Sequence, residues 1–114
     1  MSAPVVQALS AEVCVAPQLE PAAMAWAAAN GFRSVINNRP DFEGGPEQPT
    51  SAAMQAAAEA AGLRYAFLPV APAIQTPAEI AAFAALLAEL PKPVLAFCRS
   101  GTRSSKLYLA ATGG

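Results

Sequence analysis

Short apolar segments alternate with alanine-rich stretches along this chain, and this pattern predicts strands alternating with helices. Residues 5–9 and 12–16 have the composition of two short strands, and the Ser-Ala step between them suits a tight hairpin. Further strands are predicted at residues 32–37, 63–70 and 94–97. The last of these, VLAF, is apolar throughout, as expected for a strand that is buried on both faces.

Start and stop signals for helices lie between the predicted strands. Pro21 suits the first turn of a helix that ends at the Asn-Gly pair of residues 30–31. Thr50 or Ser51 is the expected cap of a second, alanine-rich helix, which ends at Gly62. Both helices therefore connect one predicted strand to the next.

A third helix has the clearest start, because Thr76 and Glu79 have the spacing of a capping box. Its apolar residues recur on one face at helical spacing and are predicted to pack on a sheet, namely Ile80, Phe83, Leu87 and Leu90. The Pro-Lys-Pro segment of residues 91–93 ends this helix, and residues 103–112 form a fourth.

The alternation of strands and helices predicts one α/β domain over residues 1–114, with a mainly parallel sheet flanked by helices on both faces. The carboxyl ends of parallel strands lie at one edge, which is where open α/β sheets bind ligands. Three loops are expected to gather there, at residues 38–49, 71–75 and 99–102.

Composition narrows the functional classes. Apolar residues make up 54% of the chain and charged residues 13%, and the formal net charge is -1. Without a block of like charge, neither nucleic acid nor an anionic membrane is an expected partner. The N-terminus lacks the basic start and apolar stretch of a secretory signal, and no segment has the length and apolarity of a membrane span. The expected location is the cytoplasm.

The cysteine and histidine counts exclude further chemistry. Cys14 and Cys98 are the two cysteines, and the chain has no histidine, so neither a disulfide framework nor a zinc site is expected. We predict neither a metal nor another cofactor. The lack of histidine also removes the commonest general base, so any nucleophile must be activated in another way. Cys14 is interpreted as a buried structural cysteine.

The stretch FCRSGTRSS places Cys98 directly after the apolar strand and before a turn rich in arginine and hydroxyl groups. Gly101 permits positive φ, so that backbone N–H groups at a helix N-terminus can form a cradle for an anion. Such a cradle also favours the thiolate form of Cys98 without any histidine. The residues predicted to bind the substrate are Arg99, Ser100, Gly101, Thr102 and Ser104.

Arg103 is predicted to act with Cys98, because it can fold back across the turn and offer a bidentate fork to an oxyanion. Ser100 or Ser104 is expected to donate a hydroxyl hydrogen bond to the thiolate. The alternative is that Cys98 is one more buried cysteine. Against it, three of the seven basic residues lie within residues 98–106, namely Arg99, Arg103 and Lys106.

With these residues in view, the chain resembles the bacterial beta-lactamase-hydrolase-like, or phosphatase-like, family, whose fold is that of dual-specificity phosphatases. The segments that carry the resemblance are VAPQLEP, GFRSVINNRPD and above all VLAFCRSGTRS. The resemblance implies a four-stranded, mostly parallel sheet with the cysteine strand in the middle. Members occur alone or fused to metallo-hydrolase and sulfide-oxidising domains, and many are described as sulfurtransferases.

Two departures separate the cysteine loop from that of tyrosine phosphatases, whose signature is His-Cys, five residues and Arg. Phe97 stands in place of the histidine, and four residues separate Cys98 from Arg103. The shorter loop resembles the rhodanese pattern Cys-Arg-x-Gly-x-Arg. By comparison of the two families, a tighter ring suits a sulfane sulfur better than a phosphate tetrahedron.

The distribution of acids decides between the two chemistries. A phosphatase requires an acid to protonate its leaving group. Asp41 is the one aspartate of the chain, and Arg39 and Asp41 form a second loop at the expected edge. Glu43 and Glu47 could replace Asp41 as the acid. The preferred interpretation is that both are solvated charges of the loop.

Sulfur transfer requires no such acid, because thiosulfate expels sulfite, which is a stable anion. We therefore predict a sulfurtransferase that works through a Cys98 persulfide, with a cysteine phosphatase that uses Asp41 as the alternative. A third reading is a non-catalytic carrier of an oxyanion or persulfide. The expected partners are a small anionic sulfur compound or phosphate ester and a separate sulfide- or persulfide-oxidising enzyme.

Overall fold

The computed structural model describes residues 4–113, and its strands and helices alternate in the predicted order. The elements are β1 (Gln7–Ala8), β2 (Val13–Ala16), α1 (Ala23–Ala29), β3 (Ser34–Asn37), α2 (Ser51–Ala60), β4 (Arg64–Phe67), α3 (Pro77–Glu89), β5 (Val94–Phe97) and α4 (Thr102–Thr112). Several elements are shorter than predicted. The strand expected to reach residue 70 ends at Phe67, because the chain turns there into a loop, although the Leu68 N–H still donates to the Asn37 carbonyl at 2.9 Å.

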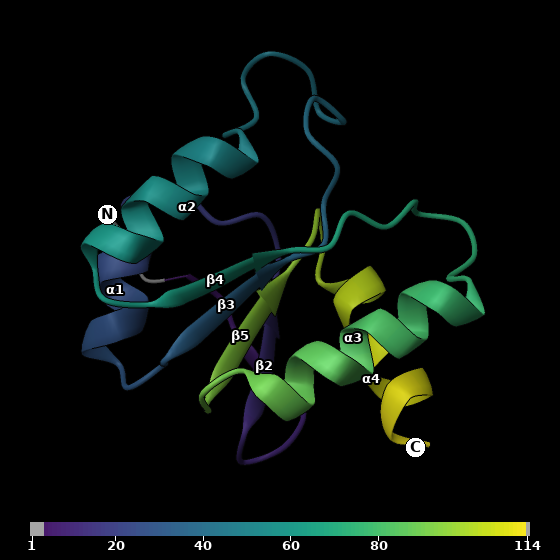
Figure 1. The fold of residues 1–114 in the computed structure, drawn as a ribbon. Coiled ribbons are helices and arrows are strands. Elements are labelled where there is room, and N and C mark those ends of the chain that lie inside the picture. The colour runs from purple at the N-terminus through teal and green to yellow at the C-terminus, as the bar shows by residue number, and fades with distance from the viewer. Residues whose placement is uncertain (1–3, 114) are drawn as a thin grey trace.

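Five strands form one sheet in the order β1-β2-β5-β3-β4 (Figure 1). β2, β5, β3 and β4 run parallel, and β1 pairs antiparallel with β2. The mostly parallel sheet is confirmed. The expected number of four strands is wrong by one, because β1 adds a short antiparallel edge. Ser10 closes this hairpin, since its Oγ accepts the N–H groups of Glu12 and Val13, each at 3.1 Å.

β5 lies in the middle of the sheet, and Ala96 pairs with Val15 of β2 on one side and Ile36 of β3 on the other. All four residues of β5 are buried, as its apolar sequence predicted. The residue after β5 is Cys98. The cysteine therefore follows the most deeply covered strand of the sheet.

Helices cover both faces of the sheet, α1 and α2 on one face and α3 and α4 on the other (Figure 1). Side chains of β5 alternate between the two cores. Leu95 and Phe97 pack with α1 and α2, and Val94 and Ala96 pack with α3 and α4. Each large side chain buried in this way contributes about 1.5–3 kcal/mol, so the two cores hold the cysteine strand rigidly in place.

Two predicted helix caps are confirmed. In the capping box of α3, Thr76 Oγ1 accepts the Glu79 N–H at 3.1 Å, and Glu79 Oε1 accepts the Thr76 N–H at 2.8 Å. At the start of α2, Thr50 Oγ1 accepts the Ala53 N–H at 3.1 Å. Each cap stabilises its helix by about 1 kcal/mol. The predicted apolar face of α3 packs on the core, with Phe83 and Leu90 buried and Ile80 and Leu87 half-buried.

The carboxyl ends of the four parallel strands lie at one end of the sheet, near the centre of Figure 1 and below the long loop that leads to α2. The long loop of residues 38–50, the loop of residues 68–76 and the turn of residues 98–101 gather at this end, as predicted. No helix within residues 4–113 has the length and apolarity needed to cross a membrane.

Candidate active site

The thiol of Cys98 lies inside the turn that connects β5 to α4. Its Sγ accepts the backbone N–H of Gly101 at 3.0 Å, and the residue is 0% exposed. Gly101 has φ 91° and precedes the first residue of α4, so the thiol lies at the positive end of that helix. The predicted glycine conformation is confirmed, α4 begins one residue earlier than predicted, and the donor to the sulfur is a backbone N–H group.

The shape of the turn is held by the strand beside it. A Cβ on Gly101 would lie 3.5 Å from the backbone carbon and oxygen of Ala16, so β2 packs directly against the turn. The Cys98 N–H donates to the Ala16 carbonyl at 3.4 Å, and the Gln18 N–H donates to the Arg99 carbonyl at 3.1 Å. The turn that holds the thiol is therefore fixed by main-chain hydrogen bonds at Cys98 and Arg99 and by close packing of Gly101 against Ala16.

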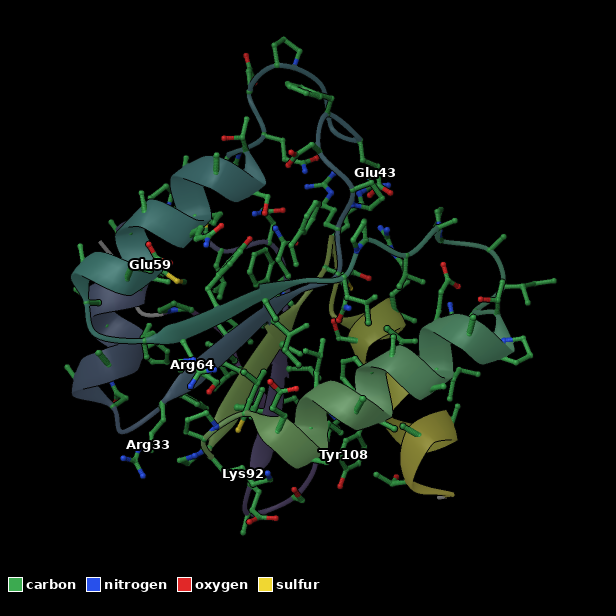
Figure 2. The ribbon with its side chains drawn as sticks, viewed as in Figure 1. Arg33, Glu43, Glu59, Arg64, Lys92 and Tyr108 are labelled. Atoms are coloured by element: carbon green, nitrogen blue, oxygen red, sulfur yellow. The ribbon has the colours of Figure 1, made fainter. Side chains whose placement is uncertain are left out.

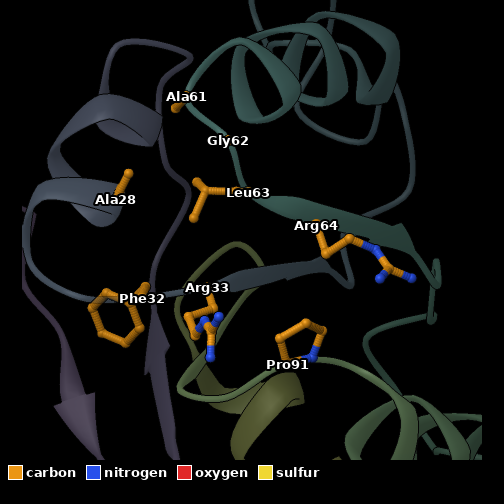
Figure 3. Close-up of a pocket in the computed structure, with 8 residues that line it drawn as sticks. All are labelled: Ala28, Phe32, Arg33, Ala61, Gly62, Leu63, Arg64 and Pro91. Carbon is orange, nitrogen blue, oxygen red and sulfur yellow. The ribbon is translucent and has the colours of Figure 1, made fainter.

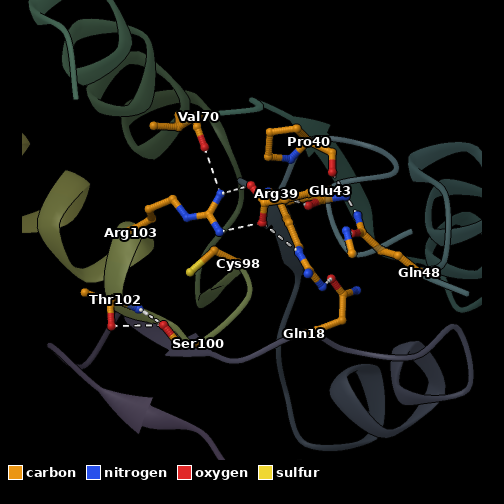
Figure 4. Close-up of polar contacts among 12 residues, drawn as sticks. Gln18, Arg39, Pro40, Glu43, Gln48, Val70, Cys98, Ser100, Thr102 and Arg103 are labelled. Carbon is orange, nitrogen blue, oxygen red and sulfur yellow. Dashed lines mark hydrogen bonds and ion pairs between the residues drawn. The ribbon is translucent and has the colours of Figure 1, made fainter. Parts of the chain in front are cut away.

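Arg103 points into the site, next to Cys98 (Figure 4). Its Nη1 and Nη2 donate to Oε2 and Oε1 of Glu43 at 2.8 and 2.7 Å, and Nη1 also donates to the Val70 carbonyl at 2.9 Å. The guanidinium thus forms the predicted bidentate fork, and a carboxylate of the protein itself fills it. Hydrogen bonds to Glu43, with a smaller effect of the Cys98 charge, raise the pKa of Arg103 above its ordinary value.

Arg39 is the second guanidinium on the same carboxylate. Its Nε donates to Glu43 Oε1 at 3.0 Å, and its Nη1 donates to Gln18 Oε1 at 3.2 Å. The hydrogen bond from Arg103 is the main cause that lowers the pKa of Glu43, and Arg39 adds to it. The preferred reading of Glu43 as a solvated loop charge is therefore wrong, since its side chain is 22% exposed and bridges two arginines.

The hydroxyl groups of the turn do not bond to the thiol within the described contacts. Ser104 is fully buried, and its Oγ donates to Asn38 Oδ1 at 2.9 Å. Ser100 Oγ donates to Thr102 Oγ1 at 3.0 Å and accepts the Thr102 N–H at 3.4 Å. The expected hydroxyl bond to Cys98 is wrong, because Ser104 faces β3 and the Ser100 hydroxyl turns back on its own loop.

Asp41 lies in the long loop that also carries Glu43, and its carboxylate is bound at the start of α2. Its Oδ1 accepts the backbone N–H of Ser51, the first residue of α2, at 2.7 Å. The Ser51 hydroxyl in turn lies 2.9 Å from the Tyr65 hydroxyl. The structure thus brings Arg39 to the site and uses Asp41 to anchor the loop on α2.

Two adjoining hollows open above the turn. One has a volume of about 480 Å³ and is lined by Arg39, Glu43, Gly44, Pro72, Arg99 and Arg103. The other, of about 270 Å³, is lined by Pro72, Arg99, Ser100, Thr102, Arg103 and Lys106. Cys98 lines neither hollow, so the candidate nucleophile lies beneath this basic surface rather than in it.

A third hollow lies at the opposite end of the sheet, where Arg33 and Lys92 are found in Figure 2, far from Glu43. It has a volume of about 420 Å³, and Figure 3 shows its lining residues, which are Ala28, Phe32, Arg33, Ala61, Gly62, Leu63, Arg64 and Pro91. These residues include two arginines but no cysteine and no acid. This hollow therefore lacks a nucleophile.

Three side-chain amides support the site, and their roles were not predicted from the sequence. Gln18 holds Arg39, and Asn38 holds Ser104 while its Nδ2 donates to the Leu68 carbonyl at 3.0 Å. Gln48 spans the long loop, with Oε1 accepting the Gly44 N–H and Nε2 donating to the Pro40 carbonyl (Figure 4). The one available signal was the position of Asn38 directly after a buried strand.

Several solved structures share this fold. A protein from Neisseria meningitidis described as a "putative phosphatase" is 33% identical, with a TM-score of 0.82 over 89% of this chain and 71% of that one. A protein of the same description from Shewanella putrefaciens is 22% identical, with a TM-score of 0.76 over 92% and 66% of the two chains. Tk-PTP shares the fold at 15% identity, with a TM-score of 0.71 over 96% and 73%.

Sequence comparison gives the family. Proteins named beta-lactamase hydrolase-like protein are 47% identical in Agrobacterium fabrum and 49% identical in Xylella fastidiosa, over 71% of this chain. The chain spans only 19% of the length of these curated relatives. The family model for the phosphatase-like domain of beta-lactamase hydrolase-like proteins matches residues 6–114. The chain therefore belongs to this family of phosphatase-like domains, and it shares its fold with solved structures described as "putative phosphatase".

Proposed function

We propose that this phosphatase-like domain is a sulfurtransferase in which Cys98 is the nucleophile and Arg103, with Arg39, binds the oxyanion of the substrate. The observation that carries the proposal is that both Glu43 and Asp41 are held by hydrogen bonds to other groups of the protein. Glu43 is held between two arginines, which lowers its pKa, and Asp41 accepts the N–H of Ser51 on α2. Neither carboxyl group is arranged to deliver a proton to a leaving group at neutral pH.

The proposed first step suits a site that holds an anion but lacks a proton donor. The Cys98 thiolate attacks the outer sulfur of thiosulfate, the S–S bond of thiosulfate breaks, and sulfite departs with the bonding electron pair. The product is a Cys98 persulfide anion. Because sulfite is a stable dianion, it leaves without protonation, and total charge is the same on both sides of the step.

The second step returns the enzyme to its starting state. A thiolate or cyanide attacks the outer sulfur of the persulfide, and the Cys98 thiolate leaves with the electron pair of the S–S bond. The N–H group of Gly101, which donates to Cys98 at 3.0 Å, stabilises the negative sulfur at the beginning and end of the cycle. Four residues separate Cys98 from Arg103, and this short turn is consistent with a sulfane sulfur on Cys98, which is smaller than a phosphate group.

A cysteine phosphatase is the second candidate, and the structural neighbours favour it. The 33% identical protein from Neisseria meningitidis carries the description of a phosphatase. In this reaction Cys98 attacks phosphorus and forms a phosphocysteine, which water then hydrolyses. The leaving alkoxide or phenoxide needs an acid, so Asp41 would have to leave the Ser51 N–H group and turn toward the thiol.

Intact-mass measurement after incubation with thiosulfate separates the two candidates. We expect the protein to gain the mass of one sulfur atom and to release one equivalent of sulfite. Cys98→Ser should abolish both signals, and Cys14→Ser, the matched control in the same chain, should keep them. Addition of cyanide should then remove the added sulfur as thiocyanate.

Assays on an aryl phosphate complete the test. Hydrolysis that disappears in Cys98→Ser, with no sulfur gained from thiosulfate, would establish the phosphatase in place of the sulfurtransferase. Sulfur that attaches once and is not passed to cyanide or a thiol would instead support a carrier of persulfide. A protein that gains sulfur equally well in Cys98→Ser would refute the sulfurtransferase, because Cys98 would not be the acceptor of the sulfur.

A further inference from the structure

The Glu43 carboxylate occupies the position that suits an anionic substrate. It accepts hydrogen bonds from Arg103 at 2.7 and 2.8 Å and from Arg39 at 3.0 Å. A bidentate fork from one guanidinium and a third bond from another is the arrangement with which proteins recognise carboxylate, phosphate and sulfur oxyanions. An incoming oxyanion therefore meets a cradle that the protein has already filled.

The burial of Cys98 shows that a ligand must move something to reach it. The residue is 0% exposed, and it does not line the hollow of about 480 Å³ above the turn. Among the six residues that line this hollow, Glu43 is the one whose charge repels an anion. Displacement of Glu43 would remove this repulsion and make both guanidinium groups available.

Each arginine keeps a second anchor when Glu43 leaves. Arg103 remains bound to the Val70 carbonyl at 2.9 Å, and Arg39 remains bound to Gln18 at 3.2 Å. The cradle therefore does not depend on Glu43 for its position. This distinguishes Glu43 from a residue that merely holds Arg103 in place.

The loop that carries Glu43 is braced within itself. Gln48 joins the Gly44 N–H at 2.7 Å to the Pro40 carbonyl at 2.9 Å, so residues 40–48 can pivot as a unit about the hydrogen bond between Asp41 and the Ser51 N–H group. The hydrogen bonds between Glu43 and Arg103 link this loop to α4. Their release would free the loop from the cysteine turn while leaving its internal contacts intact.

We propose that Glu43 is an internal competitor of the substrate, a carboxylate that occupies the paired guanidinium groups until an oxyanion displaces it and the loop of residues 40–48 opens over Cys98. This inference rests on the proposed function only in assigning an oxyanion to the cradle. With Glu43 displaced, Arg39 and Arg103 present two positive charges, which match a dianion such as thiosulfate or a phosphate ester. The bound substrate thus replaces the protein's own anion.

Calorimetric titration with sulfate, an unreactive dianion, tests the competition. Glu43→Gln should bind sulfate about tenfold more tightly than the wild type, because a site that is open only a tenth of the time loses affinity by that fraction. Glu47→Gln removes a charge from the same loop without touching the cradle, and should leave the affinity unchanged. Weaker or equal binding by Glu43→Gln would overturn the proposal, since a residue that only positions Arg103 would give that result.

Alkylation by iodoacetamide, which is uncharged, supplies an independent readout of loop opening. Cys98 should react several-fold faster in Glu43→Gln than in the wild type, while Cys14 in the same molecule should react at an unchanged rate. Equal Cys98 rates would contradict the opening of the loop. If Glu43→Gln does not fold, Glu43→Asp replaces it, because the shorter side chain cannot reach both guanidinium groups.

The two proposals fail separately. If Glu43→Gln binds sulfate more tightly but the wild type gains no sulfur from thiosulfate, the sulfurtransferase is refuted and the proposed role of Glu43 as a competitor stands. Sulfur transfer together with weaker sulfate binding by Glu43→Gln would keep the enzyme and refute the competitor.

Discussion

Two pairs of arginines lie at opposite ends of the same sheet and differ in what surrounds them. Arg39 and Arg103 are 8% and 6% exposed and share the carboxylate of Glu43. Arg33 and Arg64 are exposed, and within residues 4–113 no ion pair is described for either (Figure 3). The same residue type therefore gives fixed donors at one end and solvated charges at the other. Because Gln18 and the Val70 carbonyl keep Arg39 and Arg103 in place when Glu43 leaves, only the first pair is expected to serve catalysis.

The connections at the two ends explain this difference. At the carboxyl end of β3, the long loop of residues 38–50 folds back over the turn and carries Glu43 to Arg103, sixty residues away in sequence. At the other end, the chain passes from α2 to β4 through the short turn at Gly62. A short turn supplies no side chain that can hold Arg33 or Arg64. The length of the neighbouring loop, more than the number of arginines, thus explains why the arginines are held in place at the site and not at the opposite hollow.

The largest effect is expected from Arg103→Lys, with Arg64→Lys as the matched control at the other end. Lysine keeps the charge but cannot form the bidentate fork, so the rate of sulfur loading from thiosulfate should fall about 10²-fold, as after loss of an oxyanion donor. Arg64→Lys should leave the rate unchanged. Rapid-quench mass spectrometry measures both rates. Equal rates in the two variants would remove the distinction between the two arginine pairs.

A second test compares glycines with the same backbone conformation. Gly101 has φ +91° beside the thiol, and Gly62 has φ +83° beside the opposite hollow. Alanine at either position should cost about 1–2 kcal/mol, because an L side chain is strained in the left-handed region. Only Gly101→Ala should also slow alkylation of Cys98, since relaxation of the strain moves the N–H group that donates to the sulfur. Urea unfolding and iodoacetamide kinetics measure the two effects, and a slower thiol in Gly62→Ala would argue against a local cause.

Much of the fold was predictable because its signals are local. The capping box at Thr76 and Glu79 and the apolar segment of β5 depend on neighbouring residues, and both were predicted correctly. The position of Cys98 at the end of a strand followed from the same signals, whereas the central place of that strand in the sheet was implied by the family resemblance.

The contacts that fill the site were not predictable in this way. Glu43 meets Arg103 across sixty positions, and Ser104 meets Asn38 across sixty-six. A side chain on an irregular loop has no periodicity from which its partner can be inferred. Asp41 shows the same limit, because its sequence position suits a catalytic acid, whereas its carboxylate accepts the first N–H of α2.

The pH dependence of stability provides a smaller and more specific test of the ion pair between Glu43 and Arg103. The arginines lower the pKa of Glu43, so its contribution to folding is present above the ordinary glutamate pKa of about 4.3. It is lost as the pH falls through the lower pKa of the folded state. Glu43→Gln should therefore be less stable than the wild type at neutral pH, and the difference should vanish at strongly acidic pH. A stability difference that stays constant with pH would show that the charge of Glu43 is not involved.

The smallest expected effect is that of Arg33→Gln and Arg64→Gln combined. Both side chains are exposed, so their joint loss should change the free energy of unfolding by less than about 0.5 kcal/mol. Sulfate affinity and sulfur loading should also stay at the wild-type level, because neither arginine contributes to the cradle beside Cys98. Urea unfolding measures the stability of the double variant, calorimetric titration measures its sulfate affinity under the conditions used for Glu43→Gln, and mass spectrometry measures its sulfur loading. A fall in sulfate affinity would place an anion site at the wrong end of the sheet, and burial would then no longer explain which arginines bind anions.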